Sequence, residues 1–323
     1  MMQMNTIAVL TSGGDAPGMN AAIRAVVRTA KFHELKAVGI RRGFSGLMHG
    51  DLFEFTARDV SDILQRGGTI LQTARSAEFN SPEGVAHAVK QAKYFNIDGL
   101  VVIGGDGSFR GARDLAEAGL PTIGIPGTID NDIACTEYTI GFDTAVNTAK
   151  DAVDKIRDTA ASHQRCNIIE VMGRNSGAIA INVAIATGAE AVYVPEMRPE
   201  DNVDIVKVIN DGIRRNKKHF VVVLAEGVGG AGEIRERVES ETGVETKINT
   251  LGYMQRGGSP TVRDRCIASQ MGARAVDLLV NGQGNRIVGV KGGKIYDVDI
   301  MEGLSMECEG RQDLIDLALQ LSI

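Results

Sequence analysis

The chain contains no tryptophan, and aromatic residues make up only 4% of its 323 residues. Proteins that bind single-stranded nucleic acid stack the bases on aromatic side chains, so this scarcity argues against such a role. The formal net charge is −6, and an acidic protein repels polyanions and anionic membrane surfaces. Nucleic acid and membranes are therefore poor candidate partners, and any anion site must come from local groups of Lys and Arg.

Cysteine is also scarce and dispersed. The four cysteines, at positions 135, 166, 266 and 308, form no C-x-x-C pair. This pattern is typical of reduced thiols rather than of a disulfide framework or a zinc site. No apolar run approaches the roughly 20 residues that span a bilayer, and the first ten residues lack the pattern of a secretory signal. We expect a cytoplasmic protein.

Short apolar runs recur along the chain, and each is followed by a glycine-rich turn and a helical pattern. The runs predicted as buried parallel strands are Ile7–Leu10, Leu100–Ile103, Thr122–Ile125, Ile168–Val171 and Phe220–Ala225. The segments predicted as helices are Met19–Ala30, Pro82–Tyr94, Thr144–Thr159 and Pro199–Arg215. This alternation predicts a doubly wound α/β fold, in which ligands bind beyond the carboxyl ends of the strands.

Two glycine-rich turns follow predicted strands, at residues 11–18 (TSGGDAPG) and 104–108 (GGDGS). Gly13 and Gly14 let backbone N–H groups approach an anion, and the N-terminus of the following helix favours negative charge. A tight turn capped by Asp15 explains the first loop equally well. Asp106 adds a carboxylate to the second loop, and a carboxylate beside a phosphate site indicates Mg²⁺.

Missing motifs argue against two large classes of nucleotide-binding protein. The chain has no G-x-x-x-x-G-K-[ST] sequence, so it is not a P-loop enzyme. No G-x-G-x-x-G opens a helix after a predicted strand, so a dinucleotide-binding module lacks its fingerprint.

A third loop, residues 126–132 (PGTIDND), places Asp130 and Asp132 on either side of Asn131. By itself this sequence is also that of an Asx-rich turn. Together with two phosphate loops, it indicates a general base for phosphoryl transfer.

These three loops, in this order and spacing, resemble those of the bacterial ATP-dependent 6-phosphofructokinases, and the match runs from Ile7 to the final helix. The other family-like blocks are Arg66–Thr69, Thr73–Arg75, Ser162–Arg165, Met172–Arg174 and Gln255–Pro260. The resemblance implies two Rossmann-like lobes, each a mostly parallel sheet flanked by helices, with the active site in the cleft between them. The larger, mainly ATP-binding lobe would comprise residues 1–140 and 254–304. The smaller lobe, mainly for fructose 6-phosphate, would comprise residues 141–253 and 305–323.

The resemblance also implies a reaction: the γ-phosphoryl group of ATP passes to the 1-hydroxyl of D-fructose 6-phosphate in the committed step of glycolysis. The products would be fructose 1,6-bisphosphate and ADP, and Asp106 would hold the cofactor Mg²⁺ on the β- and γ-phosphates. Asp130 would take the hydroxyl proton, while Gly13, Arg75 and Thr128 would stabilise the transferring group. The further catalytic residues implied are Asp132 and Arg174.

The remaining implied contacts fall into two groups. Those of the nucleotide are Gly13, Arg75, Ser76, Gly105, Asp106, Gly107 and Ser108. Those of the sugar phosphate are Thr128, Ile129, Asp130, Arg165, Met172, Gly173, Arg174, Glu226, Lys247, Tyr253 and Arg256. In the family, Arg165 and the residue at position 247 reach in from a neighbouring subunit.

Several positions depart from the family pattern. Lys247 stands where Arg is usual, Tyr253 where His is usual, and Ala178 where Asp is usual. Because Lys offers a point charge rather than a bidentate fork, we expect altered recognition of the 6-phosphate.

Glycines at two positions favour ATP as the phosphoryl donor. Pyrophosphate-using relatives typically carry Asp in place of Gly107 and Lys in place of Gly127, which would fill the space of the α-phosphate. Two alternatives remain open: a pyrophosphate-dependent phosphofructokinase, and a regulatory paralogue with altered sugar-phosphate specificity. The presence of Asp130, Asp106 and Arg75 argues against the regulatory paralogue.

Arg24 and Arg28 suggest a second anion site. They lie four residues apart on a predicted helix, so they share a face and repel each other unless an anion joins them. A solvated basic face explains the pair as well. The resemblance assigns both to an allosteric site for ADP or phosphoenolpyruvate in a homotetramer. The other residues of that site would be Asp62, Arg157, Glu190, Arg215 and Lys217, with Arg58 in place of the Arg expected at Ala57.

Overall fold

The computed structural model describes residues 4–198, 203–308 and 310–322. The chain divides into two compact units. Unit 1 comprises the residues up to 128 together with 133–144 and 256–308. Unit 2 comprises residues 129–132 and 145–255 and those from 309 on. The assignment of ATP to one lobe and sugar phosphate to the other concerns function and stays a prediction.

The helices and strands follow one another in the alternating order expected of an α/β protein. In chain order they are β1 (Thr6–Thr11), α1 (Met19–Phe32), β2 (Lys36–Ile40), α2 (Gly43–His49), β3 (Leu52–Phe55), η1 (Glu78–Asn80), α3 (Pro82–Tyr94), β4 (Gly99–Gly104), α4 (Asp106–Glu117), β5 (Thr122–Pro126), α5 (Phe142–His163), β6 (Cys166–Val171), α6 (Ala178–Thr187), β7 (Ala191–Tyr193), α7 (Ile205–Arg214), β8 (Phe220–Ala225), α8 (Ala231–Thr242), β9 (Thr246–Thr250), η3 (Gly252–Arg256), α9 (Val262–Val280), β10 (Arg286–Lys291), β11 (Lys294–Asp299), α10 (Ile300–Ser305) and α11 (Gln312–Leu321).

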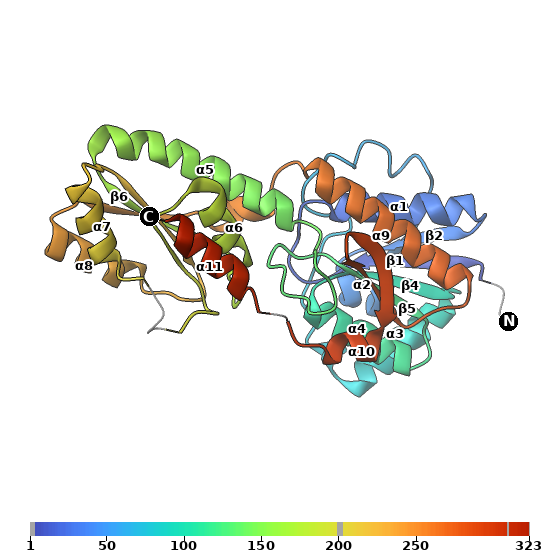
Figure 1. Ribbon diagram of the computed structural model, residues 1–323. Helices are drawn as coiled ribbons and strands as arrows, with labels where there is room; N and C mark the ends of the chain where they lie inside the picture. Colours follow the sequence, from blue (N-terminus) through green and yellow to red (C-terminus); the bar gives the residue numbers. More distant parts are fainter. Residues whose placement is uncertain (1–3, 199–202, 309, 323) are drawn as a thin grey trace. The chain divides into compact units, whose positions relative to one another are not determined.

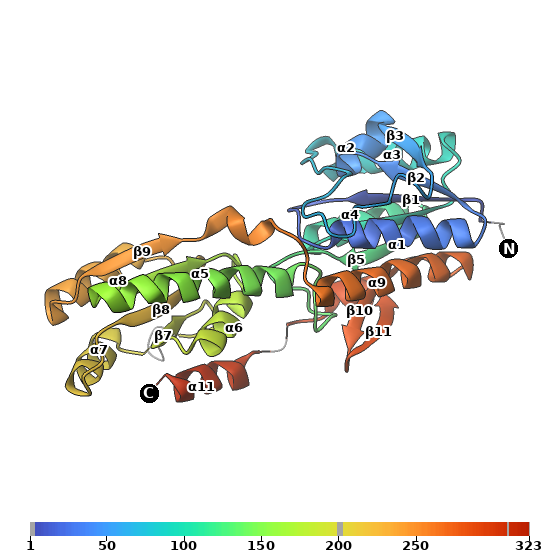
Figure 2. The same cartoon turned by 90° about the horizontal axis from the view of Figure 1, so that it is seen from above.

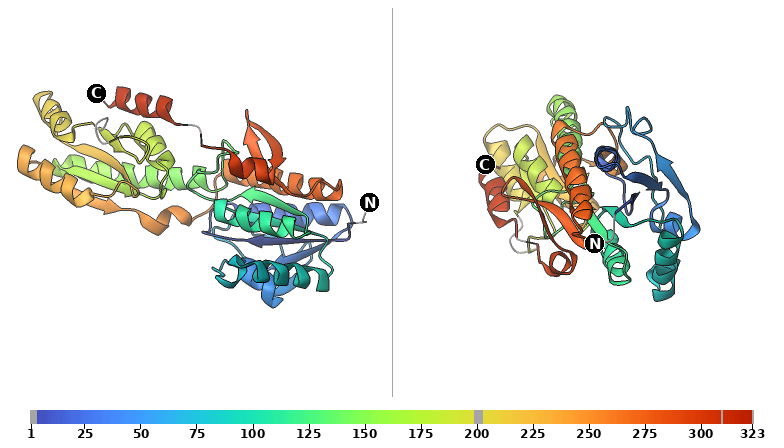
Figure 3. Two further views of the ribbon diagram at one scale, coloured as in Figure 1. Left: turned by 90° about the horizontal axis from the view of Figure 1, so that it is seen from below. Right: turned by 90° about the vertical axis from the view of Figure 1, so that its right-hand side faces the viewer.

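The sheet of unit 1 has the strand order β11-β10-β5-β4-β1-β2-β3. Its inner strands are parallel, and the edge strands β3 and β11 pair antiparallel with their neighbours. Helices α1 and α9 cover one face, and α2, α3, α4 and α10 cover the other (Figures 1 and 2). The β10–β11 hairpin is visible at its edge in Figure 3. Strands β1, β4 and β5 are wholly buried, as expected for parallel strands covered on both faces.

Helices α1 and α9 pack closely because Gly272 has no side chain. A Cβ at this position would lie 2.7 Å from Ala25 Cβ and 2.8 Å from the carbonyl oxygen of Ala22. The small residues on α1 face it, so the two helices approach each other more closely than larger side chains would permit.

The sheet of unit 2 has the order β7-β8-β6-β9, and all its pairings are parallel. Helix α6 lies against β7 and β8, α11 lies against α6 and β7, and α8 lies against β9 (Figure 1). Strand β8 and the first four residues of β6 are buried in the core of this unit. The doubly wound α/β fold predicted from the sequence is thus confirmed, in two copies.

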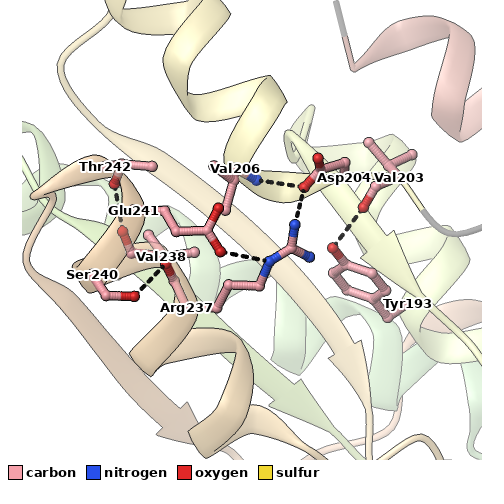
Figure 4. A network of polar contacts seen from close by, with 9 residues as sticks. All are labelled: Tyr193, Val203, Asp204, Val206, Arg237, Val238, Ser240, Glu241 and Thr242. Atoms are coloured by element: carbon pink, nitrogen blue, oxygen red, sulfur yellow. Dashed lines mark hydrogen bonds and ion pairs between the residues drawn. The ribbon is translucent and has the colours of Figure 1, made fainter.

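All five predicted strands are present, and so are the four predicted helices. Strand β8 has the predicted bounds, and the other four strands are longer than predicted by one or two residues. The helix predicted over Pro199–Arg215 begins later, at Ile205, where the side chain of Asp204 accepts a hydrogen bond from Val206 N. Positions 199–202 of that prediction lie outside the described residues. Arg237 on α8 pairs with Asp204 and Glu241 and so links α7 to α8 (Figure 4).

The buried carboxylate of Asp264 organises the start of α5 within unit 1. One oxygen accepts hydrogen bonds from Tyr138 Oη (2.5 Å) and Gly141 N (2.7 Å). The other accepts from Thr144 N (2.9 Å) and Thr144 Oγ1 (2.5 Å). Burial raises the pKa of this carboxyl, and the four hydrogen bonds act in the opposite direction. Asp264 therefore caps a helix to which it does not belong.

Among the described residues, every helix is too short or too polar to span a bilayer.

Candidate active site

The first glycine loop lies between β1 and α1. Ser12 N donates to the carbonyl of Ile103 (2.9 Å), which ties this loop to the end of β4. Gly13 has a positive φ of +85°, and a Cβ at Gly14 would lie 3.4 Å from Cζ of Arg256. Unit 1 therefore brings the Arg256 guanidinium to the backbone of the predicted phosphate loop. Asp15 does not cap α1, because the N-cap residue is Gly18 in the left-handed conformation.

The second glycine loop leads from β4 directly into α4. A Cβ at Gly104 would lie 2.4 Å from Ser108 Oγ and 2.5 Å from the carbonyl oxygen of Ser12, so only glycine fits there. A Cβ at Gly107 would meet nothing within 4 Å. The first turn of α4 thus presents backbone N–H groups beside open space, the arrangement in which helix N-termini bind phosphate.

Asp106 occupies the first turn of α4, and its side chain is 50% exposed. Its Oδ2 pairs with Arg110 Nε at 3.0 Å. In the described part of the chain, no group of three or more His, Cys, Asp or Glu side chains could hold a metal ion by itself. Mg²⁺ in kinases is bound by one or two carboxylates together with substrate phosphates and water, and a single exposed carboxylate fits that mode.

Asn20, at the start of α1, holds residues 66–70, which precede Arg75 and Ser76 in the chain. The amide of this buried residue donates to the carbonyls of Arg66 (3.0 Å) and Gly67 (3.2 Å) and accepts from Ile70 N (2.8 Å). Sequence reasoning did not single out this function. Arg75 is exposed.

Ser76 has a local bonding partner. Its hydroxyl accepts a hydrogen bond from Phe79 N (3.3 Å) at the start of η1. A nucleotide contact by Ser76, as the resemblance implies, would have to share that hydroxyl.

The third loop begins after β5 ends at Pro126. Gly127 forms a bridge with Ile140, and the carbonyl of Thr128 accepts from Thr139 Oγ1 (2.6 Å). The side chain of Asp130 is only 6% exposed, and its Oδ2 lies 3.5 Å from Arg174 Nε. The loop therefore holds the predicted base in a buried position beside a cation of unit 2.

Residues 172–174 form a turn that Glu226 holds from the end of β8. Its Oε1 accepts from Gly173 N (3.2 Å) and Arg174 N (2.8 Å). Met172 N donates to Oε1 of the buried Gln255 (2.9 Å). Gly173 has a φ of +144°, and Arg174 is also left-handed at +52°. Glu226, predicted to contact the sugar, is therefore also the residue that shapes this turn.

Two predicted phosphate ligands, Arg165 and Lys247, meet at a carboxylate that sequence reasoning missed. Glu245 accepts from Arg165 Nε (2.6 Å) and lies 2.8 Å from Lys247 Nζ. Hydrogen bonds from Lys247 and Arg165 lower the pKa of Glu245 to about 2. Tyr253, which follows β9 in η3, is 78% exposed. A phosphate that binds the two cations would have to compete with Glu245.

The predicted effector residues fall on both units. In unit 1, burial and the positive charge of the neighbouring Arg28 lower the pKa of Arg24. In unit 2, Glu190 accepts from Val221 N and pairs with Lys217, while Arg157 Nη2 lies 3.5 Å from the carbonyl oxygen of Gly188. The other predicted effector residues, Arg58, Asp62 and Arg215, are exposed.

Comparisons with known proteins find phosphofructokinases by both sequence and structure. A family model described as phosphofructokinase matches residues 6–279. An ATP-dependent 6-phosphofructokinase of Clostridium botulinum is 56% identical over 320 residues, which cover 99% of this chain and 100% of that protein. A phosphofructokinase structure from Saccharomyces cerevisiae matches with a TM-score of 0.87 at 32% identity; the match covers 99% of this chain and 48% of the yeast chain. This chain thus spans about half the length of its yeast relative.

A pyrophosphate-dependent phosphofructokinase structure from Marinobacter aquaeolei also matches, with a TM-score of 0.85. It is only 20% identical, and the match covers 99% of this chain and 92% of that one. At this identity the similarity shows a shared fold and does not indicate the phosphoryl donor.

Proposed function

The chain belongs to the phosphofructokinase family, and we propose that Asp130 takes the proton of the acceptor hydroxyl in its reaction. The reaction is that of an ATP-dependent 6-phosphofructokinase. The γ-phosphoryl group of ATP passes to the 1-hydroxyl of fructose 6-phosphate, and the products are fructose 1,6-bisphosphate and ADP. This activity makes the protein a glycolytic kinase.

The placement of Asp130 carries this proposal. Its carboxylate is 6% exposed and lies 3.5 Å from the guanidinium of Arg174. A general base must be held at a fixed position to accept a proton as the oxygen–phosphorus bond forms. Arg174 supplies positive charge next to that position, and Glu226 fixes the turn on which Arg174 lies.

Unit 1 supplies groups suited to the triphosphate. The N-terminal turn of α4 and the backbone around Gly13 offer N–H donors, and Arg75 is exposed and available to neutralise charge on the transferring group. In phosphoryl transfer, catalysis comes mainly from positioning and electrostatic stabilisation. Asp106 would hold Mg²⁺, which when bound neutralises charge on the β- and γ-phosphates.

Gly107 supports ATP rather than pyrophosphate as the donor. We expect Gly107→Asp to raise the KM for ATP by about tenfold or more, because the new carboxylate would extend into the open space beside the phosphate loop and repel phosphate. Stability should not fall, because an acidic residue in the first turn of a helix is favourable by about 0.3–1 kcal/mol. The measurement is the KM for ATP together with a thermal melt.

Gly107→Ala is the matched control, since it adds a methyl group and no charge. It should leave the KM for ATP within about threefold of the parent, below the tenfold change expected for a repelling charge. An unchanged KM in Gly107→Asp would show that the triphosphate does not lie beside α4.

Lys247 and Tyr253 are proposed to weaken binding of the 6-phosphate. The double change Lys247→Arg with Tyr253→His should lower the KM for fructose 6-phosphate by about three- to tenfold, because a guanidinium can pair with phosphate and Glu245 at the same time. The measurement is the KM at saturating ATP. An unchanged KM would mean that these positions do not limit recognition of the phosphate.

Regulation and assembly are further proposals. The neighbouring guanidinium groups of Arg24 and Arg28 are suited to an anionic effector, such as ADP or phosphoenolpyruvate, and Glu190 and Lys217 carry the charges of the second half of that site. We propose a homotetramer, as implied by the family resemblance, and a cytoplasmic location.

The decisive experiment measures initial rates with ATP, Mg²⁺ and varied fructose 6-phosphate, and repeats them with pyrophosphate in place of ATP. Saturable formation of fructose 1,6-bisphosphate with ATP alone is the expected result. Turnover with pyrophosphate alone would favour the pyrophosphate-dependent alternative. Binding of ATP without turnover of either donor would favour a regulatory paralogue.

A further inference from the structure

The segment that precedes α11 brings a guanidinium to the third loop within unit 2. Arg311 donates from Nη2 to the backbone carbonyl of Asn131, the residue between Asp130 and Asp132. Its side chain is 19% exposed. This contact joins residues 180 positions apart in the sequence.

The other side of the same guanidinium meets Glu196. Arg311 Nη1 lies 3.4 Å from Glu196 Oε1. The carboxylate of Glu196 in turn accepts from Gly177 N at 2.8 Å and 3.0 Å through its two oxygens. A Cβ at Gly177 would lie 2.5 Å from Glu196 Oε2, so the absence of a side chain permits this close approach.

Gly177 closes the loop that begins with Met172 and carries Arg174. Arg311 and Glu196 therefore link two short segments: the backbone of the Asp130 loop and the end of the turn from which Arg174 reaches Asp130 Oδ2. Glu226 thus holds the beginning of the segment 172–177, Glu196 holds its end, and Arg311 holds the backbone of the Asp130 loop.

The contact with Arg311 fixes one peptide of the Asp130 loop. Asn131 has a φ of +48°, a left-handed conformation that Asn adopts more readily than most residues other than glycine. A hydrogen bond from a charged donor to the carbonyl of that residue fixes the orientation of the peptide that follows Asn131. The direction of the neighbouring Asp130 side chain depends on the same backbone.

We propose that Arg311 is a positioning residue that fixes the orientation of Asp130 for proton transfer. The inference rests on the proposed function of Asp130. It acts through the backbone of Asn131, and Glu196 holds its guanidinium in place. Arg311 thus supports the orientation of Asp130 from outside the third loop.

The test is Arg311→Ala. We expect kcat to fall by about 10- to 100-fold, since a displacement of about 1 Å at a catalytic group costs on the order of 10²-fold. The KM for ATP should stay within about twofold, because the predicted nucleotide contacts belong to unit 1. A change of the same size in the KM for ATP, with kcat unaltered, would overturn the proposal.

Rescue separates positioning from a general loss of stability. Ethylguanidinium at low millimolar concentration should restore part of the lost kcat of Arg311→Ala without raising its Tm. In Arg311→Lys the charge remains, but the single ammonium nitrogen cannot bond Asn131 and Glu196 in the way that the two terminal nitrogens of the guanidinium do, so kcat should lie between the parent and the alanine variant. A variant that loses activity only in proportion to folded protein, and is not rescued, would contradict the proposal.

Arg237→Ala is the matched control. Arg237 also belongs to unit 2 and also has two polar partners, forming ion pairs with Asp204 at 2.8 Å and with Glu241 at 3.1 Å (Figure 4). None of its partners belongs to the Asp130 loop or the turn at Arg174. Its loss should leave kcat unchanged within about twofold, well below the loss expected from a displaced catalytic group.

Asp130→Asn, assayed in parallel, distinguishes the two hypotheses. If Asp130→Asn keeps its activity, the proposed function of Asp130 is wrong whatever Arg311 does. If Asp130→Asn is inactive while Arg311→Ala resembles the parent enzyme, only the role of Arg311 is refuted. Loss in both, with rescue of Arg311→Ala, supports both.

Discussion

Replacing Asp130 with Asn should lower kcat by about 10³- to 10⁴-fold and change the KM for ATP by less than about threefold. The amide has nearly the shape of the carboxylate but cannot accept the proton of the sugar hydroxyl. Because Asp130 is buried beside Arg174, a solvent-borne base has poor access to the same position. Steady-state rates at saturating substrates measure the effect.

Asp158→Asn provides the control for this substitution. Asp158 is an exposed residue on α5, so the same chemical change there should leave kcat unaltered. Binding of ATP to Asp130→Asn should persist, which shows that the variant is folded. A decrease in kcat smaller than about tenfold would mean that another group takes the proton, since general base catalysis contributes at least about 10²-fold.

Gly227→Ala should reduce kcat/KM for fructose 6-phosphate by about 100-fold. A Cβ at this position would lie 2.0 Å from the carbonyl oxygen of Arg174 and 3.0 Å from Pro195 Cγ. Since backbone rather than a flexible side chain is in the way, the turn at 172–174 must move and the hydrogen bonds to Glu226 must lengthen. A displacement of about 1 Å at such a turn is enough for a loss of this size.

The control is the same substitution at another glycine of unit 2, Gly232→Ala. Gly232 lies in α8, and a Cβ there would meet nothing within 4 Å. This change should preserve activity and raise stability by about 0.5–1 kcal/mol, because alanine is the better helix former. Equal kinetics in the two variants would show that the turn tolerates displacement.

Much of the fold could be predicted because its inner strands are continuously apolar. Runs such as Leu100–Ile103 and Phe220–Ala225 are buried on both faces and therefore lack the alternation that marks half-exposed strands. The edge and polar strands were not predicted. Strand β9, with the sequence TKINT, and β11, with KIYDVD, carry charged or polar residues and are only partly buried.

Helix α6 shows a different limit of sequence reasoning. Its sequence, AIAINVAIAT, is apolar almost all round, and periodicity alone does not distinguish such a segment from a buried strand. In the structure the segment is a helix that packs between β8 and α11. Its length, and its position after the turn at Gly177, are the features that favour a helix over a strand.

The candidate site was predictable where function leaves a local motif. The glycine loops and the Asp130 loop are short sequences in which residue types and spacing directly indicate phosphate chemistry. Asn20, Glu245 and Arg311 leave no such signal. Each acts through a contact with residues distant in sequence, as when Asn20 bonds to residues 46, 47 and 50 positions away. A single sequence does not show which distant residues lie close together in space.

The four hydrogen bonds at Asp264 restrict how this chain can evolve. Each carboxylate oxygen accepts from a backbone N–H, that of Gly141 or that of Thr144, so an asparagine in either orientation would place its NH₂ group against a donor. Hydroxyl groups can rotate to accept a hydrogen bond, but a backbone N–H cannot. The nearly isosteric substitution Asp264→Asn is therefore unfavourable. Evolutionary change at position 264 requires accompanying changes in the backbone between Tyr138 and Thr144.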